Sequence, residues 1–150
     1  FDVTDYKMDV QISPTENKMS ATVDVYFTTK EETRSVTFEL NGSIKVEEVT
    51  RQNAASAVIP ATPVKGKPAP KPATATNPVT FVQDQVGVSD IGPNVRVDLG
   101  ETVAAGTPVA LRFKYTGILT TAQGGPLLTK RLAYVGSRDG YLMYAARWFP

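Results

Sequence analysis

Histidine and cysteine are both absent from this sequence of 150 residues. Without them, a Ser-His-Asp triad, a Cys-His pair, a disulfide and a zinc site with nitrogen or sulfur ligands cannot be built from these residues. Only carboxylates, lysine and tyrosine remain for acid–base chemistry. An enzyme complete within these residues is therefore the least favoured interpretation.

A strong charge of either sign is also missing, because the formal net charge is only +1. A field that weak gives no reason to expect a nucleic acid as a partner. No run of about eighteen apolar residues occurs either, so the sequence predicts no segment that spans a membrane.

What the chain does have is alternation of apolar and polar residues. Residues 6–12 and 19–28 alternate on either side of SPTENK (13–18), whose composition is that of a turn in which Asn17 can take a positive φ. Further alternating runs occupy residues 35–40, 44–49, 79–83, 95–99 and 109–117. No stretch of ten residues carries a helical stripe. The pattern predicts one all-β domain over residues 1–150, an antiparallel β-sandwich of six to nine strands.

One segment breaks the alternation. Residues 60–78 hold six of the eleven prolines and three lysines, with no aromatic and no acidic residue. Proline removes ladder donors and favours extended geometry, so we predict a long flexible Pro/Ala/Lys loop within the domain. Pro60 and Pro63 have the spacing of a PxxP ligand, but a solvated insertion is the favoured interpretation.

Isolated polar motifs add little chemistry. Asp98 and Glu101 flank a turn and could lie close together, yet nothing in the sequence marks them as a catalytic pair. Asn41-Gly42-Ser43 is a turn that also fits the glycosylation acceptor pattern.

The C-terminal ten residues, YLMYAARWFP, include four aromatic rings and the only tryptophan, Trp148. Aromatic rings bury large areas, so this tail is expected to pack against something. Its rings could belong to the core of this domain or to an interface with another, and the two are not exclusive.

Four stretches, in order, resemble the aminopeptidase N family of zinc metallopeptidases (gluzincins). They are VTDYKMDVQISPTENKMSATVDVYF (3–27), VTFELNG (36–42), VRVDLGETVAAGTPVALRFKYTG (95–117) and AARWFP (145–150). The last is similar to the family's A-R-x-x-F-P stretch, with one residue fewer before Phe149. The resemblance implies the saddle-like, non-catalytic N-terminal β-sandwich of a longer polypeptide, with the aromatic tail (residues 141–150) as its last strand.

The resemblance also implies what lies elsewhere. The family's H-E-x-x-H zinc helix and its G-x-M-E-N strand do not occur here, so zinc and the aminopeptidase activity are expected in a downstream catalytic domain. The partners implied are that domain of the same polypeptide and, through it, a peptide substrate. A secreted or cell-envelope location is favoured over a cytoplasmic one.

Two groups of residues are implied at the domain's edge. In many family members a glutamate or glutamine shortly before A-R-x-x-F-P meets the substrate's free amine; the corresponding positions here are Tyr141, Leu142 and Met143, none of which carries a charge. Contact with the catalytic domain is expected from Tyr144, Arg147, Trp148 and Phe149. A family member without activity, or a free-standing binding module of immunoglobulin or fibronectin type, are the alternatives.

Overall fold

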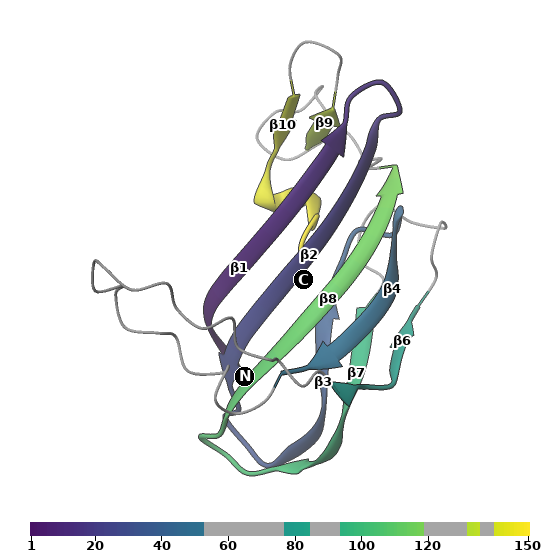
Figure 1. Ribbon diagram of the computed structural model, residues 1–150. Coiled ribbons are helices and arrows are strands. Elements are labelled where there is room, and N and C mark those ends of the chain that lie inside the picture. The colour runs from purple at the N-terminus through teal and green to yellow at the C-terminus, as the bar shows by residue number, and fades with distance from the viewer. Residues whose placement is uncertain (53–76, 85–93, 119–131, 136–139) are drawn as a thin grey trace, which may run out of the picture.

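The computed structural model describes residues 1–52, 77–84, 94–118, 132–135 and 140–150. These residues form antiparallel sheets and a single 3-10 turn, Tyr144–Ala146 (Figure 1). The larger sheet has the order β1 (Asp2–Ser13), β2 (Lys18–Thr28), β8 (Pro108–Ile118), β4 (Ile44–Arg51) and β5 (Asn77–Pro78). The second has the order β3 (Thr33–Glu39), β7 (Asn94–Val103) and β6 (Phe81–Gln83). A small sheet pairs β10 (Gly140–Leu142) with β9 (Ala133–Val135).

The first two strands form the predicted hairpin. β1 and β2 pair from Asp2 opposite Thr28 to Ser13 opposite Lys18. The turn between them closes with a hydrogen bond from the Glu16 N–H to the Ser13 carbonyl oxygen (3.1 Å), and Asn17 takes the positive φ of 51° that its position suggested. The alternation of both runs is thereby confirmed as strand structure.

The core lies between the two larger sheets. The Phe38 ring of β3 meets the Phe113 ring of β8 edge-on at 5.1 Å and the Phe27 ring of β2 at 5.9 Å. The other large side chains that are fully buried come from both layers: Met19, Val23, Val25, Leu40, Ile44, Val49, Val95, Leu99, Leu111 and Tyr115. Two antiparallel layers with their apolar faces together make the β-sandwich that the alternation predicts.

Three details differ from the prediction or extend it. The described residues contain ten strands rather than six to nine, because β5, β9 and β10 are too short for a periodic signal. Residues 60–76 of the predicted loop lie outside the described residues, but Asn77–Pro78 form β5 at the edge of the larger sheet, where a proline is tolerated. The aromatic tail is a strand only at its beginning, where Tyr141 and Leu142 belong to β10; AARWFP begins in the 3-10 turn and continues without ladder partners among the described residues.

Candidate functional site

The C-terminal segment (residues 143–150) is anchored to the turn between β3 and β4 by Asn41. Asn41 is fully buried, and its side-chain Nδ2 donates a hydrogen bond to the carbonyl oxygen of Ala146 (2.9 Å). The backbone N–H of Asn41 donates a second one to the carbonyl oxygen of Arg147 (2.7 Å). Its Oδ1 accepts hydrogen bonds from the N–H of Ser43 (2.9 Å) and from its hydroxyl (2.6 Å). Because the Asn41 amide is buried and bonded, it offers no accessible glycosylation acceptor in the folded chain.

Arg147 redirects the chain after the 3-10 turn. Its φ of 51° is in the left-handed region, and its N–H donates to the Tyr144 carbonyl oxygen (2.9 Å). Its Nη2 lies 3.2 Å from Oε2 of Glu39 on β3. The bend aims the last residues back into the sandwich, so they cannot continue as a strand in line with the turn.

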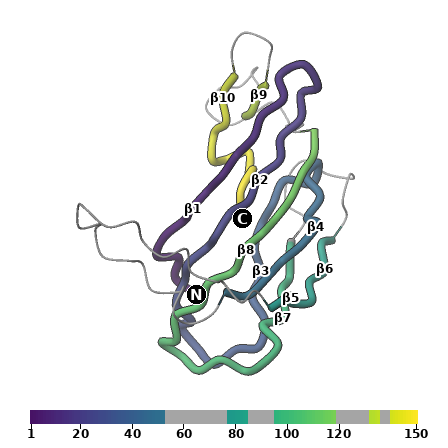
Figure 2. The backbone as a smooth tube through the Cα atoms, in the orientation of Figure 1, coloured from purple at the N-terminus to yellow at the C-terminus, as the bar shows by residue number. Residues whose placement is uncertain are grey.

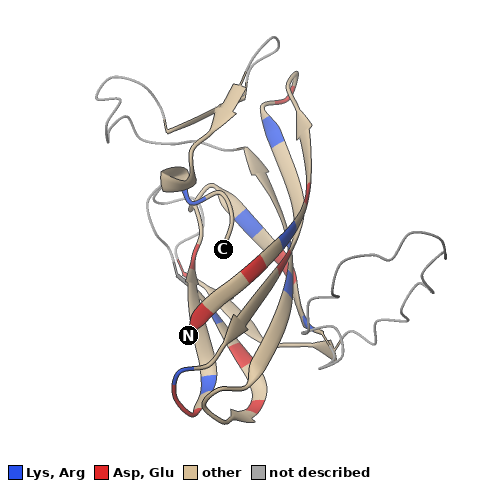
Figure 3. Ribbon diagram, turned by 90° about the vertical axis from the view of Figure 1, so that its left-hand side faces the viewer, with Lys and Arg blue, Asp and Glu red and all other residues tan. Residues whose placement is uncertain are grey.

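The residues after Arg147 lie between the two layers. Figure 2 follows the chain to its C-terminus behind β1 and β2, and Figure 3 shows that end between the sheets. The Phe149 ring meets the Tyr6 ring of β1 edge-on at 5.3 Å and the Trp148 ring at 4.7 Å. Trp148 is partly buried against the core cluster, whereas Tyr144 is 80% exposed. Trp148 and Phe149 therefore pack within this domain, and Tyr144 projects from it.

Beside this segment is a groove of about 540 Å³. One wall is β1 and the other is β3, with the C-terminal segment between them. Its apolar lining consists chiefly of Phe1, Val3, Tyr6, Phe38, Phe149 and Pro150. The predicted contact residues Tyr144, Arg147 and Phe149 line it, whereas Trp148 does not and packs against the core cluster. Sequence reasoning had not connected Phe1, Tyr6 or Asn41 with this tail.

The predicted cleft-edge residues lie on and next to β10. Tyr141 is on β10 with its ring 6.2 Å from the Tyr134 ring of β9, and both rings are exposed. Leu142 packs partly against the core, and the N–H of Met143 donates to the carbonyl oxygen of Leu132 (3.1 Å). β10 is followed directly by the C-terminal segment, so the predicted cleft-edge residues and the predicted contact residues are neighbours along the chain. Their role at a substrate cleft stays a prediction.

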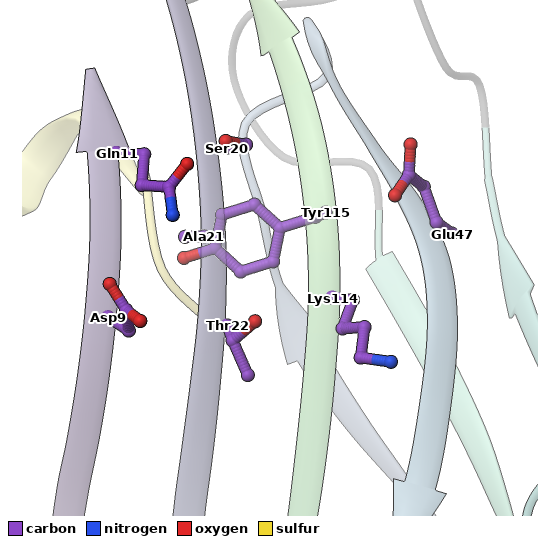
Figure 4. Close-up of a pocket in the computed structure, with 8 residues that line it drawn as sticks. All are labelled: Asp9, Gln11, Ser20, Ala21, Thr22, Glu47, Lys114 and Tyr115. Atoms are coloured by element: carbon purple, nitrogen blue, oxygen red, sulfur yellow. The ribbon is translucent and has the colours of Figure 1, made fainter.

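The outer face of the larger sheet carries a shallow hollow of about 150 Å³. Figure 4 shows polar side chains around it from four strands, among them Asp9 of β1, Thr22 of β2 and Lys114 of β8. The Lys114 ammonium is engaged by Glu48 (2.6 Å), a neighbour on β4. The lysine that lines the hollow is thus paired with a carboxylate outside the lining, and the described side chains around the hollow form no catalytic arrangement.

Asp98 and Glu101 form ion pairs with two different arginines. Asp98 pairs with Arg34 (3.1 Å) and Glu101 with Arg51 (2.8 Å). The hydrogen bond from Arg34, followed by that from the Gly100 N–H, lowers the pKa of Asp98. Each carboxylate is thus held by its own arginine, and the two do not converge on a shared partner.

The described residues do not fit a zinc ion. Within them, no three residues among Asp, Glu, His and Cys gather closely enough to hold a metal, and His and Cys are absent from the whole sequence. The same residues include no helix long and apolar enough to cross a membrane.

The geometry defines an all-β antiparallel sandwich. Its C-terminal segment lies on the side between the edge strands β1 and β3, which we call the open side. Among solved structures this fold is found in M1 zinc metallopeptidases. The enzyme from Deinococcus radiodurans aligns with a TM-score of 0.56 and 18% identity, over 83% of this chain and 22% of that one.

Two further structures are two-domain M1 zinc metallopeptidase mutants, one bound to L-tryptophan and one to L-arginine. Both align with a TM-score of 0.56 and cover 22% of their own chains, at 18% and 19% identity. They cover 83% and 84% of this chain. No protein-family model and no curated protein matches the sequence. The resemblance to zinc metallopeptidases is confirmed at the level of the fold, and the chain spans about a fifth (22%) of the length of these structures.

Proposed function

We propose that this chain is the non-catalytic N-terminal domain of an aminopeptidase-like zinc metallopeptidase. The observation that supports it most is the proportion of the two matches: 83% of this chain aligns with only 22% of the metallopeptidase from Deinococcus radiodurans. A domain within a larger enzyme has that relation to the whole. The residue motifs found in sequence order point to the same family.

The proposed role is to cover one side of the catalytic cleft and to pack on the catalytic domain. Tyr144 is the side chain best placed for the contact, because its ring is 80% exposed beside the apolar groove. Exposed tyrosine and arginine residues next to an apolar surface are typical of interface hot spots. Arg147, which is held by Glu39 at the edge of the same groove, is the second candidate.

If this domain contacts a peptide substrate, it would do so without the carboxylate that pairs with the substrate's free amine in many family members. Tyr141, Leu142 and Met143 cannot pair with an α-ammonium group through a charge, so these residues would supply apolar and aromatic contacts at the cleft edge. Zinc, and the reaction itself, would belong to the catalytic domain. A secreted or cell-envelope location goes with this proposal.

The test uses the natural polypeptide and the chain 1–150 side by side. We expect the natural polypeptide to hydrolyse an aminoacyl-p-nitroanilide, to lose that activity with a chelator and to regain it with zinc. The chain 1–150 should show none of this. A much larger natural polypeptide that neither binds zinc nor cleaves the substrate would indicate a family member without activity. A natural polypeptide that consists of residues 1–150 alone would contradict the proposal.

A free-standing binding module is the second candidate function. Tyr134 and Tyr141 favour it, because both are exposed and their rings lie 6.2 Å apart, as in an aromatic surface that binds a ligand. The two candidates differ in the natural mass of the protein: the binding module predicts a mass near 16.2 kDa.

A further inference from the structure

The inner face of β1 is apolar but only partly covered: Tyr6 and Val10 pack against the core cluster, whereas other side chains on the same face are exposed. Met8 and Ile12 are 39% and 44% exposed, although their partners across the strand pair, Val23 and Met19, are fully buried. Val3, at the beginning of the strand, is likewise 40% exposed opposite the buried Phe27. Paired residues point to the same face of a sheet, so these β1 side chains face the layer that holds the core. Val3, Met8 and Ile12 are thus apolar like core residues, yet they are exposed like surface residues.

The cause is the unequal width of the two sheets. The larger sheet has five strands and β1 is its edge, whereas the second has three and ends at β3. Within the described ranges, β1 pairs only with β2 and β3 only with β7. Both are therefore edge strands of the described sheets, and the edge of a sheet carries backbone N–H and C=O groups with which a further strand can pair. Apolar side chains from both strands line the groove between them.

We propose that this open side takes up one further β-strand, which extends the second sheet beyond β3 and covers the inner face of β1. A strand fits both requirements at once. Its backbone satisfies the edge of β3, and its alternate apolar side chains fill the space under β1 at the ordinary spacing of stacked sheets, about 10 Å. A helix would leave the backbone groups of β3 without partners.

The strand comes from the polypeptide that follows Pro150. Pro150 is buried and lines the groove together with Phe149, so residues that follow it start inside the groove. The source of the strand, though not the open side itself, rests on the proposed function, in which this chain is one domain of a longer protein. A second copy of the chain is the competing occupant, and it would leave a different signature.

The test exploits the absence of cysteine, since a single introduced thiol can be followed alone. Val3→Cys and Met8→Cys place it on the inner face of β1, and Gln11→Cys places it on the outer face of the same strand (Figure 4). Each variant is made in the chain 1–150 and in the natural polypeptide, its fold is checked by circular dichroism, and the thiol is labelled with Ellman's reagent. Val3→Cys is nearly isosteric and remains informative if Met8→Cys does not fold.

We expect labelling at positions 3 and 8 to slow by more than about tenfold in the natural polypeptide, because reaction then requires local opening, while position 11 changes by less than about twofold. Hydrogen exchange of the β3 amides, measured on both unsubstituted proteins, should slow as well. Equal labelling in both proteins would overturn the proposal. So would protected thiols without slower β3 exchange, slow labelling in a dimeric chain 1–150, or a natural polypeptide that ends at Pro150. None of these readouts depends on zinc or hydrolysis, so the peptidase proposal can fail without this one.

Discussion

Asn41 and Arg147 join parts of the chain that are far apart in the sequence: the backbone N–H of Asn41 donates to the carbonyl oxygen of Arg147 at 2.7 Å. The Asn41 side chain reinforces this bond by donating to Ala146 at 2.9 Å. One buried turn residue thus fixes where the C-terminal segment enters the space between the two sheets. The shape of the groove follows from that attachment.

Replacing Asn41 with alanine should destabilise the domain by about 2–3 kcal/mol, because it removes several hydrogen bonds and leaves a buried carbonyl oxygen unpaired. The free energy of unfolding in urea can be followed by the fluorescence of Trp148, which stands in the same segment and is the only tryptophan. Gln11→Ala, on the exposed outer face of β1, is the control and should change stability by less than about 0.5 kcal/mol. Equal losses in the two variants would contradict the anchoring role of Asn41.

Tyr144→Ala and Trp148→Ala should separate docking from folding. The exposed Tyr144 ring should leave the stability of the chain unchanged within about 0.5 kcal/mol, yet its loss should weaken association with the catalytic domain by more than about 1 kcal/mol. Trp148→Ala should cost about 2–3 kcal/mol of folding stability, because its ring packs on the core. Unfolding curves of the chain and titration calorimetry against the separately produced catalytic domain measure the two effects. Unchanged association of a folded Tyr144→Ala variant would rule out the proposed contact.

Two neighbouring cations on the outer face of β8 should differ in importance. Arg112 binds Asp24 with two hydrogen bonds of 2.6 and 2.8 Å, and the Asp24 side chain is only 11% exposed. Asp24 accordingly raises the pKa of Arg112. Arg112→Ala should cost about 2–3 kcal/mol, since it strands a largely buried carboxylate. Lys114→Ala, which breaks a more exposed pair with Glu48, should cost less than about 1 kcal/mol. Chemical denaturation of both variants checks the order, which would be wrong if Lys114→Ala cost as much.

The Tyr115 hydroxyl should make stability depend on pH in the alkaline range. Burial raises its pKa far above the ordinary value, and among the described residues the hydroxyl has no hydrogen-bond partner. Above about pH 10 the unfolded chain releases this proton while the folded chain keeps it, so the free energy of unfolding falls as the pH rises. Tyr115→Phe should show a smaller fall between about pH 8 and pH 11, with equal or slightly higher stability at pH 7. Parallel curves for both proteins would contradict this.

Shortening the Pro/Lys segment should be tolerated. Arg51 and Asn77 are paired between β4 and β5, so the ends of the connection already lie side by side. Deletion of residues 62–76 should leave the melting temperature nearly unchanged, because loop length enters the closure entropy only logarithmically. A large loss in a thermal melt would show that these residues pack.

Alternation alone predicted most of the sandwich. It located β1, β2, β3, β4, β7 and β8 within a few residues, since each buries one face and exposes the other. It could not divide the strands between two sheets, because that division depends on pairings such as β2 with β8 that are distant in sequence. The apolar positions of the alternation in β1 include Met8 and Ile12, and a regular pattern of this kind does not reveal that the narrower second sheet leaves them 39% and 44% exposed.

The candidate site was only partly predictable. The aromatic tail and the family resemblance together led to Tyr144, Arg147, Trp148 and Phe149 as expected contact residues, but not to which of them pack inward; their contact with another domain stays a prediction. That distinction depends on Arg147, whose positive φ turns the chain back between the sheets and leaves Tyr144 outside. The Asn-Gly dipeptide indicated a turn at residue 41, whereas its bonds to residues 146 and 147 have no local signal.

Native mass spectrometry of the protein as its own cells produce it tests the central claim most directly, because it determines the length of the polypeptide and its bound metal in one spectrum. The proposed function predicts a polypeptide several times heavier than 16.2 kDa that carries zinc. A zinc-free polypeptide with a mass near 16.2 kDa would contradict it and would make the open side of the sandwich a binding surface for a separate partner.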